Sequence, residues 1–540
     1  MTKIKNNINF FILFALFFLL FTGFNLITNE LLDNSYVLAK NQEYILNKKS
    51  IPENWELKKT IIVPESYLDK YSKKLNGEII SLYNYLIDCE GDDLWVNPVT
   101  ASSEAEAKNI YDTMLVNKTE DFLYHNKNLV VEFVGFENAK KAKKMLKFVK
   151  KETENPLTTE EGIYLKDNSR NLNFTGNQLK GLDLLSDSIS GKKLFITAES
   201  HGVSVNQKLE FEFLKYFKEK ANINYYLQET AFSTSMLLNK YLETGNEDIL
   251  KQVFKPLEGT FAWTKEKYNL WKNIYRFNQS LPERERIIVL GFDIEHQLEN
   301  AFWYLNTIIP EKEVPKDIKP YILRIKSIHQ NKEYDNREIK DFVHKLKDNI
   351  DKNEKIYQDF FDQDFFGFQL VNNNVINRYK AYQKKNNEWN ITRDKMMYDN
   401  FLKIYSRYSD GKYYGQWGLN HAFQKKQDGV NWFASKLDND GDSPLKGQIL
   451  SIVYLYQNCT RINNNGKYSE TSMSNNISKQ IDLLSQGEMT LFKLNGKQSP
   501  FSDNLIWMLD ETVPGNGVTT DYFQYLIFLK DFKASIPLRN

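Results

Sequence analysis

The sequence predicts an α/β fold in which helices flank a parallel-rich sheet, with a long helical insertion and a small α+β domain in front. Three observations support this. After about residue 190, apolar runs of strand length alternate with helix-like segments, as in parallel sheets. Residues 297–408 keep a helical pattern with long polar faces and few turn signals, which indicates an insertion or cap. Residues 40–185 contain strands and helices of their own, and the polar stretch 151–188 predicts a linker.

The size and charge of the chain limit the classes of function. Its 540 residues are enough for about two or three domains, and 41% hydrophobic with 26% charged residues is typical of a globular protein. The formal net charge is only +1, so nothing in it favours nucleic acid, and we expect no nucleic-acid partner. Cys89 and Cys459 lie in different predicted domains and in no nucleophile motif, so we expect two separate thiols.

The first 39 residues predict export. Two lysines precede an apolar run from about Ile8 to Ile27, which is the pattern of a secretory signal and is also long enough to span a bilayer as an uncleaved anchor. The small residues between Val37 and Ala39 offer a cleavage pattern. We therefore expect residues 1–39 to be a signal peptide or a membrane anchor. The protein would be extracytoplasmic, either secreted or anchored, with membrane or cell-wall association through its N-terminus.

Residues 40–185 predict a small α+β domain of unknown role. Strand-like runs at 60–63 and 129–134 alternate with helical patterns at 103–115 and 139–149. The second of these helices has a very basic outer face, which we interpret as a solvated surface. Contact with an anionic wall polymer or a membrane surface is the alternative.

The larger predicted domain, residues 190–540, starts with strands and helices in alternation. The strand 194–198 precedes a helix whose apolar residues Leu209, Phe213 and Phe217 are spaced by four. The other predicted elements are, in chain order, strand 223–227, helices 235–244 and 265–280, and strands 287–291, 412–418, 449–456, 489–494 and 525–529.

Polar side chains follow four successive predicted strands. Glu199 and His201 end the first strand, and Glu229, Asp293 and His421 follow the next three. In parallel sheets the carboxyl ends of the strands meet at one edge, where ligands bind. We therefore expect these five side chains to lie at one site.

The pair at the first strand end has a spacing that suits acid/base chemistry. Residues i and i+2 of an extended chain point the same way, so Glu199 and His201 would face one spot. A histidine beside a carboxylate is a common general base with its orienting partner. Two imidazoles and three carboxylates also suit a metal site. No nucleophile elbow or HExxH motif is present, which favours direct attack by water.

Aromatic and basic residues near these strand ends are candidates for substrate binding. Trp263 and Trp417 could wall a binding pocket, and core packing explains them equally well. Arg393 is a candidate hydrogen-bond donor, whereas Asp394 next to it is expected only to cap or solvate a helix.

Six short motifs give the chain a resemblance to a known family. Their order resembles that in the erythromycin esterase-like superfamily, which also includes the haem-binding ChaN proteins, and the resemblance covers about residues 190–460. The motifs are Ala198-Glu-Ser-His-Gly202, Gln228-Glu-Thr230, Gly259-Thr-Phe-Ala-Trp263, Gly291-Phe-Asp-Ile294, Met397-Tyr-Asp-Asn400 and Asn420-His421.

The resemblance implies roles for individual residues. His201 matches a general base that activates water against an ester without a metal, and Glu199 matches the acid that orients it. Glu229 and His421 match groups of the same pocket, and Asp293 matches a residue that holds the strand-end turn. One residue separates the acid from the histidine here, where the esterases have two.

The sequence therefore predicts an exported hydrolase that cleaves an ester or related bond of a small-molecule or cell-envelope substrate, without a metal or cofactor. The predicted catalytic residues are His201, Glu199, Glu229 and His421, and the predicted substrate-binding residues are Asp293, Trp263, Arg393 and Trp417. The alternatives are a metal-dependent hydrolase that uses the same cluster, a haem- or ligand-binding protein, and a surface protein with an inactive pocket.

Overall fold

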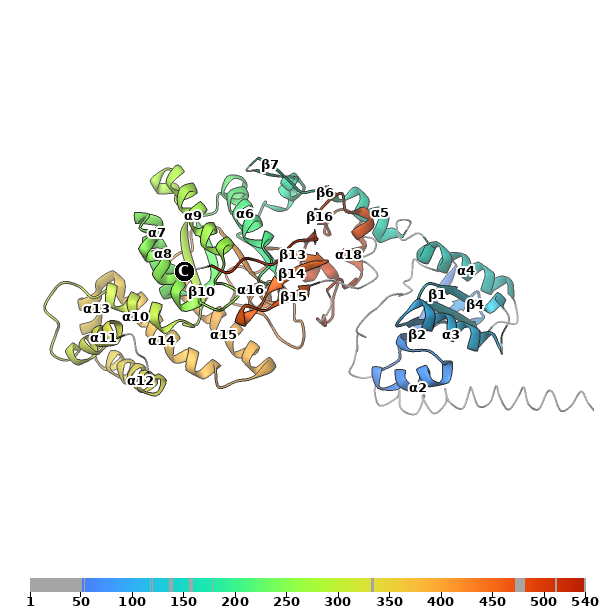
Figure 1. Ribbon diagram of the computed structural model, residues 1–540, viewed down its shortest axis with the longest axis horizontal. Coiled ribbons are helices and arrows are strands. Elements are labelled where there is room, and N and C mark those ends of the chain that lie inside the picture. Colours follow the sequence, from blue (N-terminus) through green and yellow to red (C-terminus); the bar gives the residue numbers. More distant parts are fainter. Residues whose placement is uncertain are drawn as a thin grey trace, which may run out of the picture. The chain divides into compact units, whose positions relative to one another are not determined.

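The structure is a computed structural model (Figure 1). It describes residues 51–538, apart from 53, 117, 119, 136–138, 155–158, 177, 332–334, 472–480, 510 and 511. The expected signal peptide or anchor, 1–39, lies outside these residues. Within the described ranges, no helix is both long and apolar enough to cross a membrane.

The chain divides into two units between Glu154 and Asn155. The first contains an antiparallel sheet in the order β1-β2-β3-β5-β4 with an apolar cluster on each face. Val130 and Val131 enter different clusters, because successive side chains of a strand point to opposite faces. This confirms the predicted α+β class. The elements are β1 (Trp55–Ile62), α2 (Glu65–Leu75), β2 (Ile79–Cys89), β3 (Asp93–Ala101), α3 (Glu104–Leu115), β4 (Leu123–Asn126), β5 (Leu129–Val134) and α4 (Ala139–Glu154).

Residues between 159 and 188, which the sequence predicts to be a linker, are instead folded into the second unit. They form α5 (Glu160–Asp167), β6 (Ser169–Asn171), β7 (Asn173–Thr175) and β8 (Gln178–Lys180). Leu165, Leu172 and Leu185 are buried in the core of that unit, and β6 pairs with its main sheet. Strands of three residues are too short to give a periodic signal, so the polar composition dominated the prediction.

The second unit contains the predicted parallel-rich sheet. Its strand order is β11-β10-β12-β9-β13-β17-β16-β6; the first six strands are parallel to one another, β16 is antiparallel to β17, and β6 is antiparallel to β16. Along the chain β12 comes after β9, β10 and β11, but in the sheet it lies between β9 and β10. The carboxyl ends of these four parallel strands therefore lie next to one another at one edge of the sheet. The strands are β9 (Leu194–Glu199), β10 (Tyr225–Ala231), β11 (Ile288–Asp293), β12 (Tyr413–Gly418), β13 (Ile449–Gln457), β16 (Met489–Lys493) and β17 (Tyr525–Lys530).

Helices cover both faces of this sheet. On one face Phe217 of α6 packs against Tyr414 and Trp271 of α9 packs against Tyr226; on the other, α15 and α16 enclose Phe292. These helices are α6 (Val205–Ala221), α7 (Phe232–Thr244), α8 (Glu247–Phe254), α9 (Lys265–Ser280) and α16 (Phe433–Asn439). A hairpin of β14 (Cys459–Ile462) and β15 (Tyr468–Thr471) and a short helix α18 (Pro500–Asp503) follow. Cys89 and Cys459 are both free and buried.

The predicted insertion consists mainly of helices between Leu298 and Tyr405. On α12, apolar residues spaced by three and four, from Ile339 to Ile350, face the core, which accounts for the pattern in the sequence. Figure 1 shows α11, α12 and α13 grouped at the end of this unit remote from β6 and β16. The helices are α10 (Leu298–Thr307), α11 (Lys319–Asn331), α12 (Asn336–Lys352), α13 (Glu354–Phe361), α14 (Phe365–Ala381) and α15 (Asn386–Tyr405).

Candidate functional site

The histidine and carboxylate at the end of β9 form the pair that their spacing predicts. His201 Nδ1 lies 2.5 Å from Glu199 Oε1. The His201 side chain is 37% exposed and that of Glu199 only 8%, so the imidazole is the member that solvent reaches. Because Nδ1 is bound to the acid, Nε2 is the nitrogen that can exchange a proton with a reactant.

The space around His201 Nε2 is set by its neighbours. The ring of Phe261 stacks on the imidazole, with 4.3 Å between centroids and 6° between planes. A Cβ at Gly418 would lie 3.1 Å from His201 Nε2 and 3.5 Å from Glu229 Oε2, so the glycine at the end of β12 keeps this position open. His201 and Glu229 therefore border the same space beside Gly418.

Charge around His201 favours its protonated form. Burial lowers the pKa of His201, but the Glu199 carboxylate, with help from Glu229, more than offsets this and raises the pKa above 6.5. An imidazolium formed at this position is therefore stabilised, which suits a base that must hold a proton during a reaction.

Glu199 is held by residues that the sequence analysis missed. The side-chain amide of Asn206, in the first turn of α6, donates to Glu199 Oε2 and, at 2.9 Å, to the Ser200 carbonyl. The Tyr456 hydroxyl donates to Asn206 Oδ1 at 3.0 Å. Asn206 is fully buried, so this network fixes the carboxylate from behind. Asn206 lies only seven residues after Glu199, whereas Tyr456 belongs to β13, and no local pattern marks either residue.

A second group forms around Arg393 of α15. Its guanidinium donates to Asp293 through Nε, at 3.1 and 3.2 Å, and through Nη2, and Nη2 also donates to Glu229 Oε1 at 2.8 Å. Glu229 Oε2 accepts from the Gly418 amide at 2.8 Å. Burial would raise the pKa of Glu229, but His421 and Arg393 hold it well below 4.5. Glu229 is therefore a fixed carboxylate that joins the two groups.

His421 has its own carboxylate partner. Its Nδ1 lies 2.9 Å from Oδ1 of the buried Asp394, which also accepts from the Phe433 amide at 2.7 Å. Burial lowers the pKa of His421, but Asp394 and Glu229 raise it to about 10. The protonated Nε2 can donate to Glu229 Oε1 at 3.3 Å, whereas in the neutral form it accepts from Arg393 Nη1 at 3.0 Å.

Asp394 corrects the expectation that it only caps or solvates a helix. Its side chain is fully buried and orients a histidine. The charged run on either side of it gave the sequence the appearance of an exposed helix face. Only the packing of α15 against β11 and α16 turns this residue inward.

The four predicted catalytic residues are thus brought together, but not all predicted substrate contacts are. Asp293 is buried and bound by Arg393 and His296, so it positions the guanidinium. Trp417 packs in the core between Phe292 and Phe433, and its indole donates to the Leu227 carbonyl at 2.8 Å.

Trp417 is therefore corrected from a binding residue to a core residue, because alternation along β12 turns it away from the strand-end site. Trp263 packs near Phe254, and Phe261 of the same turn is the residue that stacks on His201.

Among the described residues, no group of three or more His, Cys, Asp and Glu side chains is arranged to hold a metal ion. The acids of the site are engaged with Arg393, a backbone amide or a histidine Nδ1. These contacts leave few lone pairs converging on one point.

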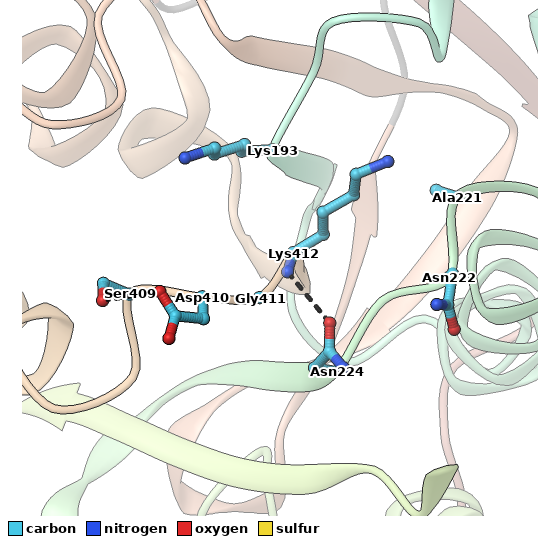
Figure 2. Close-up of a pocket in the computed structure, with 8 residues that line it drawn as sticks. All are labelled: Lys193, Ala221, Asn222, Asn224, Ser409, Asp410, Gly411 and Lys412. Atoms are coloured by element: carbon cyan, nitrogen blue, oxygen red, sulfur yellow. Dashed lines mark hydrogen bonds between the residues drawn. The ribbon is translucent and has the colours of Figure 1, made fainter.

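A cavity of about 320 Å³ lies elsewhere, at the amino ends of the parallel strands (Figure 2). Lys193, Asn224 and Lys412 immediately precede β9, β10 and β12, and the Lys412 amide donates to Asn224 Oδ1 at 3.3 Å. This cavity is therefore at the sheet edge opposite the histidines.

The fold and the site define an α/β protein with an acid/base cluster at the carboxyl edge of a parallel sheet. Solved structures share this fold. A Bacillus cereus protein is 15% identical, with 70% of this chain and 98% of that chain covered and a TM-score of 0.52. A succinoglycan biosynthesis protein is 12% identical, with 70% and 97% covered and a TM-score of 0.52.

A mutant of the erythromycin esterase EreC in its open conformation is also similar, at 12% identity with 66% and 95% covered and a TM-score of 0.48. The α/β fold with a parallel-rich sheet that the sequence predicts is confirmed, and the two structures with a TM-score of 0.52 share it. No protein-family model matches the chain, and no curated protein matches it in sequence.

Proposed function

We propose that the protein is an exported hydrolase that activates water with His201 and cleaves an ester or a related bond. The observation that supports this most is the His201–Glu199 pair, with Nδ1 bound to the acid, Nε2 facing an open position beside Gly418, and a second His–Asp pair in the same cluster. Two imidazoles, one reached by solvent and the other buried among carboxylates, can divide the roles of base and electrophile.

In the proposed reaction, neutral His201 takes a proton from water through Nε2 while the oxygen attacks the carbonyl carbon. Glu199 keeps the Nδ1 proton in place and stabilises the imidazolium. His421, held protonated by Asp394 and Glu229, supplies positive charge to the developing oxyanion. His201 then returns its proton to the leaving alcohol, so water and ester become acid and alcohol without a covalent enzyme intermediate.

The first test is a screen of ester hydrolysis with the wild type and His201→Ala. We expect the variant to lose about 10²- to 10⁴-fold in kcat, because it lacks the base. His344→Ala, which removes an exposed histidine of α12, serves as the control and keeps full activity. Turnover in His201→Ala equal to that of the wild type would overturn the mechanism, provided that thermal melts show all three proteins folded.

The same preparations distinguish the metal-dependent alternative. We expect activity to survive prolonged treatment with a chelator, because His201 and its neighbours already supply a base and positive charge. Stoichiometric zinc or manganese in the purified protein, together with loss of activity to the chelator, would reassign the cluster to a metallohydrolase.

Export and an envelope ester as substrate are part of this proposal and rest on the pattern of residues 1–39. Fractionation of the source cell tests this: the protein is expected outside the cytoplasm. Recovery only in the cytoplasmic fraction would contradict it.

A further inference from the structure

Helix α15 joins the acid/base cluster to a group of aromatic side chains. Trp389 and Arg393 are four residues apart on this helix, so they lie on the same face one turn apart. Trp389 lies near two other rings, Tyr382 and His296. We call these three residues the aromatic platform.

The platform has exposed ring area and hydrogen-bonding groups. Tyr382 is 53% exposed, with the Arg378 guanidinium 4.9 Å from its ring centroid. The Tyr382 hydroxyl and His296 Nδ1 are 3.0 Å apart. Trp389 is half-buried, and its indole N–H makes no hydrogen bond within the part of the chain that the structure describes.

The platform is connected to the proposed catalytic groups through one residue. His296 Nε2 lies 3.1 Å from Asp293 Oδ2, and Asp293 is the carboxylate that Arg393 binds. Arg393 in turn contacts Glu229 and His421. The platform is therefore one buried carboxylate away from the guanidinium of the cluster in which we place ester hydrolysis.

The arrangement of the rings suggests the shape of the ligand. The planes of Tyr382 and Trp389 are 50° apart with centroids 5.0 Å apart. One flat aromatic ring cannot stack on both, whereas a puckered saturated ring can present C–H bonds to each. The free indole N–H is a donor that a hydrocarbon ligand would leave unpaired, and the Tyr382 hydroxyl can make a hydrogen bond to a ligand besides the one it shares with His296.

We propose that the aromatic platform binds the pyranose ring of an acylated carbohydrate, so that the ester cleaved is one on a sugar hydroxyl. This proposal rests on the proposed hydrolase function for the cleavage, although sugar binding stands independently of it. A pyranose combines the C–H face and the hydroxyl rim that these residues match.

Two probes with the same acetyl group test the proposal. Methyl 6-O-acetyl-β-D-glucopyranoside carries the hydroxylated ring, and cyclohexylmethyl acetate carries a similar ring without hydroxyl groups. Saturation-transfer NMR and titration on His201→Ala, which cannot turn either over, measure binding without chemistry. We expect the sugar ester to bind more tightly and its ring C–H protons to receive the saturation.

Variants of the platform then locate the binding. Trp389→Ala should weaken binding of the sugar ester about tenfold. Trp389→Phe, which keeps a ring but removes the N–H, should recover part of this loss. Leu323→Ala, which removes a side chain 54% exposed on α11, is the matched control and should bind like its parent.

The outcomes separate this inference from the proposed function. Equal binding of the two probes, tighter binding of cyclohexylmethyl acetate, or no effect of Trp389→Ala overturns the sugar site. Hydrolysis that needs His201 but is indifferent to Trp389 also overturns it and leaves the hydrolase standing. Sugar binding that needs Trp389 in a protein without hydrolytic activity supports the sugar site and refutes the hydrolase.

Discussion

At the residue scale, two histidines of the same cluster have different surroundings. His201 is partly exposed and has one close acid, whereas His421 is nearly buried and contacts Asp394, Glu229 and Arg393. This difference assigns the base to His201, which solvent reaches, and the positive charge to His421, which carboxylates surround. Because both residues are histidines, the sequence alone could not assign these two roles.

This assignment predicts the pH dependence of kcat/KM. His201 acts only when neutral, and its pKa is raised, so activity should increase with pH through a midpoint above 6.5. His421 acts only when protonated, so activity should fall again near its pKa of about 10.

Two variants check which histidine sets which limb of that profile. Glu199→Gln should move the acidic limb to lower pH, because the neutral amide no longer favours the imidazolium. Asp394→Asn should move the alkaline limb to lower pH for the same reason. A wild-type acidic limb centred below 6.5, or variants that shift the opposite limbs, would contradict the assignment.

At the scale of elements, the segments that hold His201 come from distant parts of the chain. The amide of Ser204 donates to Lys533 O at 2.9 Å and that of Ser535 to Gly202 O at 2.9 Å. The same C-terminal segment also bonds to the region after Phe261. The Lys265 amide donates to the Ile536 carbonyl at 2.8 Å, and the Leu538 amide donates to the Trp263 carbonyl at 3.0 Å. Residues 532–538 therefore tie the His201 loop to the turn that carries Phe261.

We expect a chain that ends at Asp531 to lose about 10²-fold in kcat, because the His201 loop and the turn that carries Phe261 are then no longer joined by backbone hydrogen bonds. The melting temperature of this shortened chain should fall by less than the fall caused by deleting residues of the hydrophobic core. Ile536→Ala removes a side chain that is 51% exposed and keeps the backbone bonds, so it should remain as active as the wild type. Full activity in the shortened chain would refute this role of the segment.

The elements also show what the sequence could predict. Strands β9 to β13 and the glutamate, aspartate and histidine at their ends follow from apolar runs that end in polar residues. Asp394, Phe261 and residues 532–538 could not be predicted, because their roles depend on contacts between elements far apart in sequence. Asn206 lies only seven residues from Glu199, but nothing in the local pattern shows that its amide faces the carboxylate. Trp417 was ambiguous until the pairing of β12 fixed which face it occupies.

At the scale of the whole molecule, every residue of the candidate site belongs to the second unit. We expect a fragment of residues 155–540 to fold and to retain His201-dependent hydrolysis of small esters, because the first unit has its own apolar clusters and supplies none of these groups. The first unit would then serve location or partner choice. Measurement of kcat for the fragment and the full chain checks this, and a folded but inactive fragment would contradict it.

A second fragment, 190–540, starts at the boundary that the polar sequence suggests, and it makes the comparison decisive. It lacks β6, which pairs with β16, and five core leucines, Leu165, Leu172, Leu179, Leu182 and Leu185. Removing buried leucines costs about 2 to 5 kcal/mol each, which is comparable with the whole stability of a domain. We therefore expect 190–540 to be insoluble or unfolded by circular dichroism, while 155–540 is folded. If both fragments fold equally well, residues 159–188 contribute little to the second unit despite their burial, and the division at Glu154 would have to move.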